Sequence, residues 1–439
     1  MSTETINVIS PNHQKDTFLS VKRSSAFAWF VVTVGGLFYC YAYFLRVSPS
    51  DMMANLLHHF NINATMFGNL AAFYYYSYTP MQLPVGVIID RYGARLILFA
   101  ACLIATLGVF LFTIANNFYF AAAGRFLVGF GSAFAYISVL KLAAIWLPPN
   151  RFATVAGGTT AIGMAAAIFS DLYLGEFVQR IGYQHALLSS IIGGVVLSVI
   201  IFLFVRNRPK PKYGIDKSDS INFETVFSGF WEMMKSKQMW LIGILGLLLY
   251  MPASVFLDVW GIPYVQSAYN LSPERASQVI SMIFIGWILS APTVGWLSDK
   301  IKRRRSPLTF ASFGAAVMIC IIFYMPGITA NMLFPLFLIF GMFAGAHPLI
   351  FSLSRENNSD KLSGTSTAIT NFVVMLGGVI FQPVVGLLLD MHWNGAMRGG
   401  IPFYSIKDYR FALSVLVIGL FIAAFITFWI KETYCQIKE

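Results

Sequence analysis

Charged residues are scarce in this sequence: they make up 11% of its 439 residues, whereas hydrophobic residues make up 57%. A soluble domain of this length would carry about 25% charged residues. The apolar residues fall in repeated runs of about 20, the length that crosses a hydrocarbon core of about 30 Å. Together with a mean hydropathy of +0.69, these runs argue against a large soluble protein and predict a polytopic protein that lies in a lipid bilayer.

Cysteines and catalytic motifs are also few. The four cysteines, three of them inside apolar runs, are not spaced as metal ligands, so we expect neither a disulfide framework nor a metal site. The sequence contains no nucleotide-binding loop and no nucleophile triad. It therefore predicts neither an enzyme nor a pump with its own ATPase, and it implies no cofactor.

Positive charge is in excess, at +11. The Lys and Arg residues lie in short loops between apolar runs, where such residues set membrane topology, so we expect no nucleic-acid partner. Residues 1–25 are polar and lack the apolar core and cleavage site of a signal peptide. They are predicted to be a cytosolic tail.

Twelve apolar runs predict an all-α membrane protein with 12 transmembrane helices in two six-helix bundles, because lipid excludes irregular backbone. The N-terminal bundle, residues 26–205, has predicted spans at residues 26–49, 64–89, 94–115, 118–147, 152–176 and 182–205. The C-terminal bundle, residues 238–430, has predicted spans at residues 238–262, 276–298, 307–325, 329–353, 364–389 and 410–430. Residues 206–237 are predicted to be a cytosolic central loop and residues 431–439 a cytosolic C-terminal tail.

The basic residues also predict an orientation. Most of the 30 Lys and Arg residues lie in the two tails and the even-numbered connections. The other loops hold only Arg180, Arg275, Arg398, Lys407 and Arg410. Because basic loops stay in the cytoplasm, we expect both termini on the cytoplasmic side of the inner (plasma) membrane.

The two halves repeat one another. Three pairs of markers recur about 210 residues apart. They are Asp90 with Asp299, Trp29 with Trp240, and Phe44-Leu-Arg-Val with Phe256-Leu-Asp-Val. Such duplication predicts pseudo-symmetric bundles with a substrate site between them near the midplane.

The residues from Gly86 to Arg95 (Gly-Val-Ile-Ile-Asp-Arg-Tyr-Gly-Ala-Arg) resemble the signature loop between helices 2 and 3 of the major facilitator superfamily. A basic copy begins at Gly295, after the eighth span, as this resemblance requires. The resemblance covers nearly the whole chain and implies secondary transport by alternating access. The gate residues that it implies are Gly86, Asp90, Arg91, Gly93, Arg95, Gly295 and Asp299.

The gate has a physical interpretation. Gly86 and Gly295 are expected to permit close approach of helices. Asp90 is expected to pair with Arg95, or to cap a neighbouring helix, and so to hold the cytosolic side in one state. The alternative is that these charges only fix the topology.

A second motif, Arg125-Phe-Leu-Val-Gly-Phe-Gly on helix 4, looks like the superfamily's Arg-x-x-x-Gly-x-Gly pattern, which is linked to proton movement. The helix 5 motif of drug/proton antiporters is missing, because residues 157–175 contain no proline. The sequence therefore favours transport classes other than multidrug export.

Arg46, within the first span, is the main candidate for substrate binding. A charge in mid-membrane costs about 2.5–3.5 kcal/mol and needs a reason. Tyr39 and Tyr43 lie on its helix face, and a guanidinium offers a planar fork to a carboxylate. The run from Tyr41 to Arg46 resembles the first helix of organic-anion carriers, in which an arginine binds the anion. The alternatives are that Arg46 snorkels to the interface or pairs with Asp51.

Asp258 occupies the equivalent place in helix 7. It is expected to face Arg46 across the cavity, in a gating ion pair or as the second contact for a zwitterionic substrate. The alternative is a hydrated position beyond the hydrocarbon, near Trp260.

Other titratable residues lie within spans. Asp171 and Asp258 are the candidates for proton coupling, and Arg125 joins them through its motif. His347 either titrates or is a hydrogen-bonded histidine at a kink. Lys141 is a further intramembrane charge that either snorkels or acts in the membrane; on a straight helix it lies about 160° from Arg125.

Helix 2 is rich in tyrosine. Tyr75, Tyr78 and Gln82 share one stripe and are expected to line the cavity, whereas the neighbouring tyrosines are expected to meet lipid or other helices. The alternative for the stripe is packing alone.

These residues predict proton-coupled uptake of a small organic anion or carboxylate, with a carboxylate siderophore among the options, by a monomer. The competing transport hypotheses are an amino acid or dipeptide carrier, with Asp258 binding the amine, and efflux of a metabolite. A competitor from another class is a membrane sensor or partner subunit that does not transport.

Overall fold

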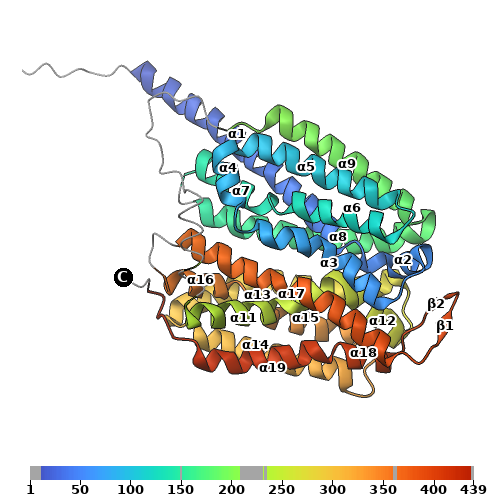
Figure 1. Ribbon diagram of the computed structural model, residues 1–439. Helices are drawn as coiled ribbons and strands as arrows, with labels where there is room; N and C mark the ends of the chain where they lie inside the picture. The colour runs from blue at the N-terminus through green and yellow to red at the C-terminus, as the bar shows by residue number, and fades with distance from the viewer. Residues whose placement is uncertain (1–10, 149–150, 208–230, 232–234, 359–362, 437–439) are drawn as a thin grey trace, which may run out of the picture.

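The computed structural model describes residues 11–148, 151–207, 231, 235–358 and 363–436, and Figure 1 shows them as two groups of roughly parallel helices. The first group contains α1 (Pro11–Val47), η1 (Ser50–Met52), α2 (Met53–Phe60), α3 (Ala64–Met81), α4 (Val85–Tyr92), α5 (Ala94–Thr113), α6 (Phe118–Ser132), α7 (Ala135–Trp146), α8 (Phe152–Ile181) and α9 (Tyr183–Phe204).

The second group contains α11 (Lys237–Met251), η3 (Pro252–Trp260), α12 (Gly261–Tyr269), α13 (Pro273–Ile301), α14 (Arg305–Tyr324), α15 (Leu333–Ala344), α16 (Leu349–Glu356), α17 (Ser363–His392), α18 (Ile406–Ala412), α19 (Ser414–Ile426) and η5 (Thr427–Trp429). A small antiparallel hairpin, β1 (Met397–Arg398) with β2 (Ile401–Pro402), precedes α18. The predicted all-α class is confirmed.

Within the described residues, eleven helices are long and apolar enough to cross a membrane. The first begins at Ala26, as predicted, although α1 itself begins earlier, at Pro11. The predicted span at residues 64–89 is not among the eleven. It is divided into α3 and α4, and α3 contains four tyrosines, which lower its hydropathy. These two helices nevertheless occupy the place where the second span is expected.

Several predicted spans are broken rather than continuous. Residues 82–84 separate α3 from α4, and residues 345–348 separate α15 from α16. Each of these breaks contains a proline, which removes a backbone donor. In the seventh span Pro252 begins η3, a π-helix that contains Asp258. π-Helical turns are rare and occur often at functional sites.

The two groups meet along α3 and α17 and along α8 and α13. α3 and α17 approach closely because glycines face backbone. A Cβ on Gly68 would lie 2.5 Å from the carbonyl oxygen of Gln382, and one on Gly386 would lie 2.3 Å from that of Ala64. Polar side chains of the two halves are thereby brought into one interface.

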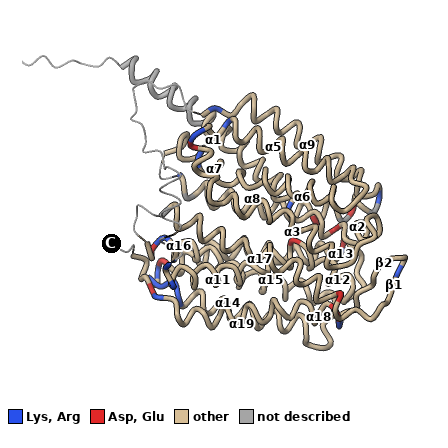
Figure 2. The backbone as a smooth tube through the Cα atoms, viewed as in Figure 1, with Lys and Arg blue, Asp and Glu red and all other residues tan. Residues whose placement is uncertain are grey.

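The two ends of the molecule differ in charge. Figure 2 shows Lys and Arg gathered at the end that holds the C-terminus, around α7 and α16. We call this the basic end, and the end near α2 and the hairpin the opposite end. α3 begins at the opposite end and α17 finishes there (Figure 1).

Candidate functional site

Arg46, in the last turn of α1, lies buried between the two halves with 5% of its surface exposed. Its Nε donates to the hydroxyl oxygen of Tyr74 at 3.2 Å, and its Nη1 donates to that of Tyr250 at 3.2 Å. Tyr74 belongs to α3 and Tyr250 to α11. The guanidinium therefore joins helices of both halves.

Four tyrosine rings surround this guanidinium. Its Cζ lies 4.8 Å from the centroid of Tyr43, 4.9 Å from Tyr78, 5.2 Å from Tyr74 and 5.7 Å from Tyr75. Such cation–π contacts favour a desolvated cation. We call Arg46, Tyr43, Tyr74, Tyr75, Tyr78, Tyr250 and Asp258 the Arg46 cluster.

Arg46 forms no ion pair with any residue in the described part of the chain. The alternative of pairing with Asp51 is therefore wrong, and burial of the side chain with bonds to Tyr74 and Tyr250 contradicts snorkelling. Asp51 instead accepts a hydrogen bond at 3.1 Å from Ser277, in the other half. A guanidinium has five N–H donors, and only two of them bond to described residues. The others remain available to an anion.

Asp258 is 2% exposed and accepts a hydrogen bond of 2.5 Å from the hydroxyl of Tyr75. The alternative of a hydrated position is therefore wrong. Tyr75 presents its ring to Arg46 and its hydroxyl to Asp258, so it lies between the two charges. Of the two expected arrangements, the direct Arg46–Asp258 ion pair is wrong, and Tyr75 bridges the two groups instead.

Arg125, on α6, is buried and contacts the end of α1. Its Nη1 donates to the carbonyl oxygen of Leu45 at 2.7 Å and its Nη2 to that of Arg46 at 3.3 Å. The last carbonyls of a helix have no partner within the helix and attract cations. Arg125 therefore fixes the end of α1 and so the position of the Arg46 side chain.

Two other predicted residues lie at the edge of the cluster. Tyr39 packs on Tyr43 and Tyr136, at ring-centroid distances of 5.7 and 5.3 Å. Gln82 accepts a hydrogen bond of 2.8 Å from Asn371 of α17 and donates to the carbonyl oxygen of Tyr78. Gln82 thus joins the two halves but does not reach Arg46.

Sequence reasoning missed Tyr74 and Tyr250. Tyr74 was expected to meet lipid or neighbouring helices, but it is buried against both Arg46 and Arg125. Its position four residues before Tyr78 places both rings on one face, where they stack. Tyr250 lies two residues before Pro252, which begins the π-helix. Its position near a proline within an apolar run is the signal in the sequence that could have identified Tyr250.

Asp171, on α8, is fully buried, and neither carboxyl oxygen has a hydrogen-bond partner among the residues that the structure describes. η1, which contains Asp51, packs on the same helix. One oxygen of Asp51 is also buried without a partner. An unpaired buried carboxylate is costly, so this pair of acids needs a reason beyond packing.

His347 lies in the break between α15 and α16, with its ring 4.8 Å from that of Tyr250. Its Nε2 is buried without a hydrogen-bond partner. The alternative of a hydrogen-bonded histidine is therefore wrong for this nitrogen. The side chain instead packs within an aromatic group that includes Trp287.

The predicted partner of Asp90 is wrong. Asp90 pairs with Lys141 of α7 at 2.6 Å, so Lys141 neither snorkels freely nor lies unpaired in the membrane. Arg95 instead donates from Nε and Nη2 to the carbonyl oxygen of Phe202, at 3.1 and 2.7 Å. The break between α6 and α7 turns Lys141 toward α4, and both contacts lie within the first half. Arg91 is exposed and lies over the ring of Tyr92.

The predicted role of Gly86 and Gly295 is also wrong, because a Cβ on either residue would meet nothing within 4 Å. Gly93 is the constrained glycine of this segment. Its φ is +83°, and a Cβ there would lie 2.5 Å from Nδ2 of Asn207. Gly93 therefore permits the turn from α4 into α5.

The second copy of the motif forms a denser network than the first. Asp299 pairs with Arg304 at 2.6 Å, and Arg304 pairs with Glu356 of α16 at 2.7 Å. Burial alone would lower the pKa of Arg304. The hydrogen bonds to Glu356 and Asp299 raise it by more than burial lowers it, so the pKa lies above its ordinary value. This charged arginine joins α13, α14 and α16 within the second half.

A contact between the halves at the opposite end was not predicted. Asp390 of α17 accepts hydrogen bonds from the backbone N–H groups of Ala64 (3.3 Å) and Thr65 (2.8 Å) and from the hydroxyls of Thr65 and Tyr404 (2.5 Å each). We call this set the Asp390 latch. It caps the N-terminus of α3, a favourable place for a carboxylate. The latch joins the two halves at the opposite end.

Comparisons with known proteins agree with this architecture. The family model of the Major Facilitator Superfamily matches residues 20–382. The chain is 22% identical to a probable galactarate/D-glucarate transporter of Escherichia coli, covering 90% of this chain and 94% of that protein. It is 23% identical to a hexuronate transporter of Bacillus subtilis, covering 81% and 87%.

Among solved structures, a bacterial homologue of the human lysosomal transporter Spinster, in an inward-facing and unoccupied conformation, superposes with a TM-score of 0.76. That likeness covers 92% of this chain and 97% of the other at 16% identity, so it concerns the fold alone.

Proposed function

Because the chain belongs to the major facilitator superfamily, we propose that it is a secondary active transporter that takes up a small organic anion together with protons. One observation supports the anionic substrate above all others. Arg46 is a permanent charge, buried between the two halves, that forms no ion pair within the described residues. A buried charge is stable only when it is paired, so a carboxylate ligand would complete the site.

The names of the relatives narrow the substrate class. Galactarate, glucarate and hexuronates are sugar acids, in which hydroxyl groups accompany the carboxylate. The Arg46 cluster offers matching groups: free guanidinium N–H donors for the carboxylate, and the hydroxyls of Tyr74 and Tyr250 for the polyol. We therefore propose a hydroxylated carboxylate of this size as substrate. The competing proposal is an amino acid with its amine at Asp258, since that carboxylate keeps acceptor sites besides the one that Tyr75 uses.

Proton coupling is the second part of the proposal. Asp171 is buried without a partner, and Asp258 lies across Tyr75 from Arg46. Buried carboxyls of this kind exchange protons at functional sites. In this scheme substrate binding at Arg46 alters the proton affinity of Asp258 through Tyr75. Asp171 holds a proton near the opposite end. Arg125 keeps the end of α1, which carries Arg46, in place. His347 is a further site for the proton.

The transport cycle follows from the contacts between the halves. The Asp390 latch closes the opposite end, and opening that end requires these hydrogen bonds to break. We propose that the basic end faces the cytoplasm of a cell with both termini there, since basic loops are retained inside. The latch would then form the extracellular gate of a monomer, and the Asp90–Lys141 and Arg304 networks would move as parts of their own halves.

Uptake into proteoliposomes tests the proposal. Purified protein is reconstituted with an inward proton gradient and supplied with radiolabelled glucuronate or galactarate. Wild type should accumulate one of them, and a protonophore should abolish the accumulation. Arg46→Gln should lower uptake by at least 100-fold, because a charge-assisted contact with a buried partner contributes about 3 kcal/mol or more. Arg46→Lys, which keeps the charge but loses the fork, should be intermediate.

Arg180→Gln is the matched control. Arg180 is exposed, pairs with Glu176 and lies at the opposite end, so its loss should leave uptake unchanged. If Arg46→Gln folds and transports like wild type, the assignment of the anion site is wrong. A protein that binds these acids but never accumulates them would contradict secondary transport.

A further inference from the structure

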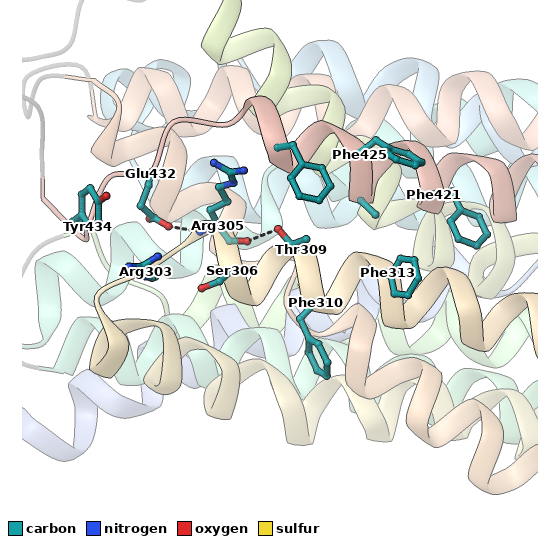
Figure 3. Close-up of a pocket in the computed structure, with 12 residues that line it drawn as sticks. Arg303, Arg305, Ser306, Thr309, Phe310, Phe313, Phe421, Phe425, Glu432 and Tyr434 are labelled. Carbon is teal, nitrogen blue, oxygen red and sulfur yellow. Dashed lines mark hydrogen bonds between the residues drawn. The ribbon is translucent and has the colours of Figure 1, made fainter.

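A groove with a volume of about 850 Å³ lies between α14 and α19. Both helices are on the outside of the second half, away from the first half (Figure 1). Figure 3 shows arginines and Glu432 at one end of this groove and phenylalanine rings along the rest of it. The groove is therefore amphipathic and is separate from the Arg46 cluster.

The apolar part of the groove consists of rings that the protein does not bury. Phe310 and Phe313 of α14 are 72% and 57% exposed, and Phe425 of α19 is 60% exposed. Phe313 faces Phe421 across the groove at a ring-centroid distance of 6.2 Å. The small side chain of Ala424 lies between the rings of α19 and leaves space. Rings in this arrangement are suited to contact an acyl chain lengthwise.

The charged part of the groove lies at the basic end. Neither Arg303 nor Arg305 forms an ion pair with a described residue. The acid beside them, Glu432, is already engaged: its oxygens accept hydrogen bonds from the backbone N–H groups of Arg304 (2.8 Å) and Arg305 (3.0 Å). Glu432 thus caps α14 and leaves the guanidinium groups without an ion pair among the described residues; that of Arg305 lies 5.6 Å from the ring centroid of Phe428, and both keep N–H donors for an anion.

The length of the groove fits one leaflet. Arg305 and Phe313 are eight residues apart, which corresponds to about 12 Å along a helix. Half of a hydrocarbon core measures about 15 Å. A phosphate held by Arg303 and Arg305 would therefore place its acyl chain along Phe310, Phe313 and Phe425 without crossing the midplane.

We propose that this groove binds an anionic phospholipid of the surrounding leaflet. The phosphate lies between the guanidinium groups of Arg303 and Arg305, within reach of the Ser306 hydroxyl, and one acyl chain follows the phenylalanines. Basic pockets between transmembrane helices on the cytoplasmic side bind anionic headgroups for this reason. Because the groove includes the start of α14 and the residues after α19, the lipid would stabilise the second half. The inference does not depend on the transported substrate.

Thermal unfolding and native mass spectrometry of the full-length protein in neutral detergent test the proposal. Phosphatidylglycerol should raise the unfolding temperature and remain bound to the protein, whereas phosphatidylcholine should do neither. Arg303→Gln/Arg305→Gln should weaken phosphatidylglycerol binding by about 30-fold, since each basic residue contributes about 1 kcal/mol. Arg151→Gln/Arg206→Gln removes the same charge from loops of the first half and should bind like wild type.

Two further arms distinguish a lipid from a free anion. Phe310→Ser/Phe425→Ser alters exposed rings only and should also weaken binding. Inorganic phosphate and glycerophosphoglycerol, which lack acyl chains, should give no stabilisation. The proposal fails if these soluble anions stabilise the protein as well as phosphatidylglycerol does, if phosphatidylcholine binds equally, or if the double arginine variant retains wild-type affinity.

Discussion

Arg46 and Asp258 are buried close to one another, yet a tyrosine separates them. The hydroxyl of Tyr75 bonds to the carboxylate while its ring contacts the guanidinium. A direct ion pair would neutralise both groups and leave little affinity for a substrate. With Tyr75 between them, each charge keeps donors or acceptors for a ligand.

Tyr75→Phe tests this bridge, because it removes the hydroxyl and keeps the ring. A hydrogen bond to a charged group contributes about 1.5–3 kcal/mol, so we expect proton-driven uptake to fall at least tenfold. Tyr76→Phe is the control, since the hydroxyl of Tyr76 bonds to Asn69, outside the cluster. Equal uptake rates for the two variants in proteoliposomes would show that the bridge has no role in transport.

The two glycines of the signature segment differ in physical role, and alanine substitutions should separate them. Gly93→Ala places a Cβ at positive φ against Asn207, so we expect a loss of about 1–3 kcal/mol of stability. Gly86 lies inside α4 with open space around it, so Gly86→Ala should be neutral or stabilising by up to about 1 kcal/mol. Thermal unfolding measures both. The opposite order would contradict this assignment.

For single residues, the sequence shows that a charged side chain lies in a span more readily than it shows which residue pairs with it. Arg46 is conspicuous because a guanidinium in an apolar run is costly. The partner of Asp90 was predicted wrongly because Arg95 is near in sequence, whereas Lys141 is brought to it by the break between α6 and α7. Tyr74 does meet neighbouring helices, as expected, but its contact with Arg46 is missed because a single stripe on an ideal helix omits rings at its edge.

Among the elements, α3 and α17 are joined most firmly at the opposite end by the Asp390 latch. One carboxylate from the second half caps a helix of the first half. Neither residue of such a pair is unusual in sequence, since Asp390 closes an ordinary span and Ala64 opens another. Contacts between halves depend on how two rigid groups meet, which a linear pattern does not specify.

Asp390→Ala should shift the protein toward a state that is open at the opposite end. Loss of an N-cap costs about 1–2 kcal/mol, which changes the ratio of the two states at least about fivefold. Spin labels at Asn116 and Met397, one in each half, should report a larger population of long distances. Asp408→Ala is the matched control, because Asp408 caps α18 within the second half. If both variants give the same distances, Asp390 is not a gate.

For the whole molecule, the predicted architecture is confirmed more fully than any single site. Runs of about 20 apolar residues determine helices, and the repeat at Asp90 and Asp299 indicates two related halves. The helix breaks were not predicted, because hydropathy is averaged over a whole span. Neither Pro84 nor Pro348 lowers that average enough to divide an apolar run. The π-helix at Pro252 has no simple sequence pattern.

The low hydropathy of α3 has a consequence for biogenesis. A translocon releases each segment into lipid according to that segment's own hydrophobicity. The tyrosines of α3 that surround Arg46 lower its hydropathy, and α3 is not among the eleven helices of the described residues that are long and apolar enough to cross a membrane. Membrane insertion of α3 should therefore depend on the helices against which it packs, α6 and the much later α17, so that the tyrosines proposed for the site would delay the maturation of the nascent chain.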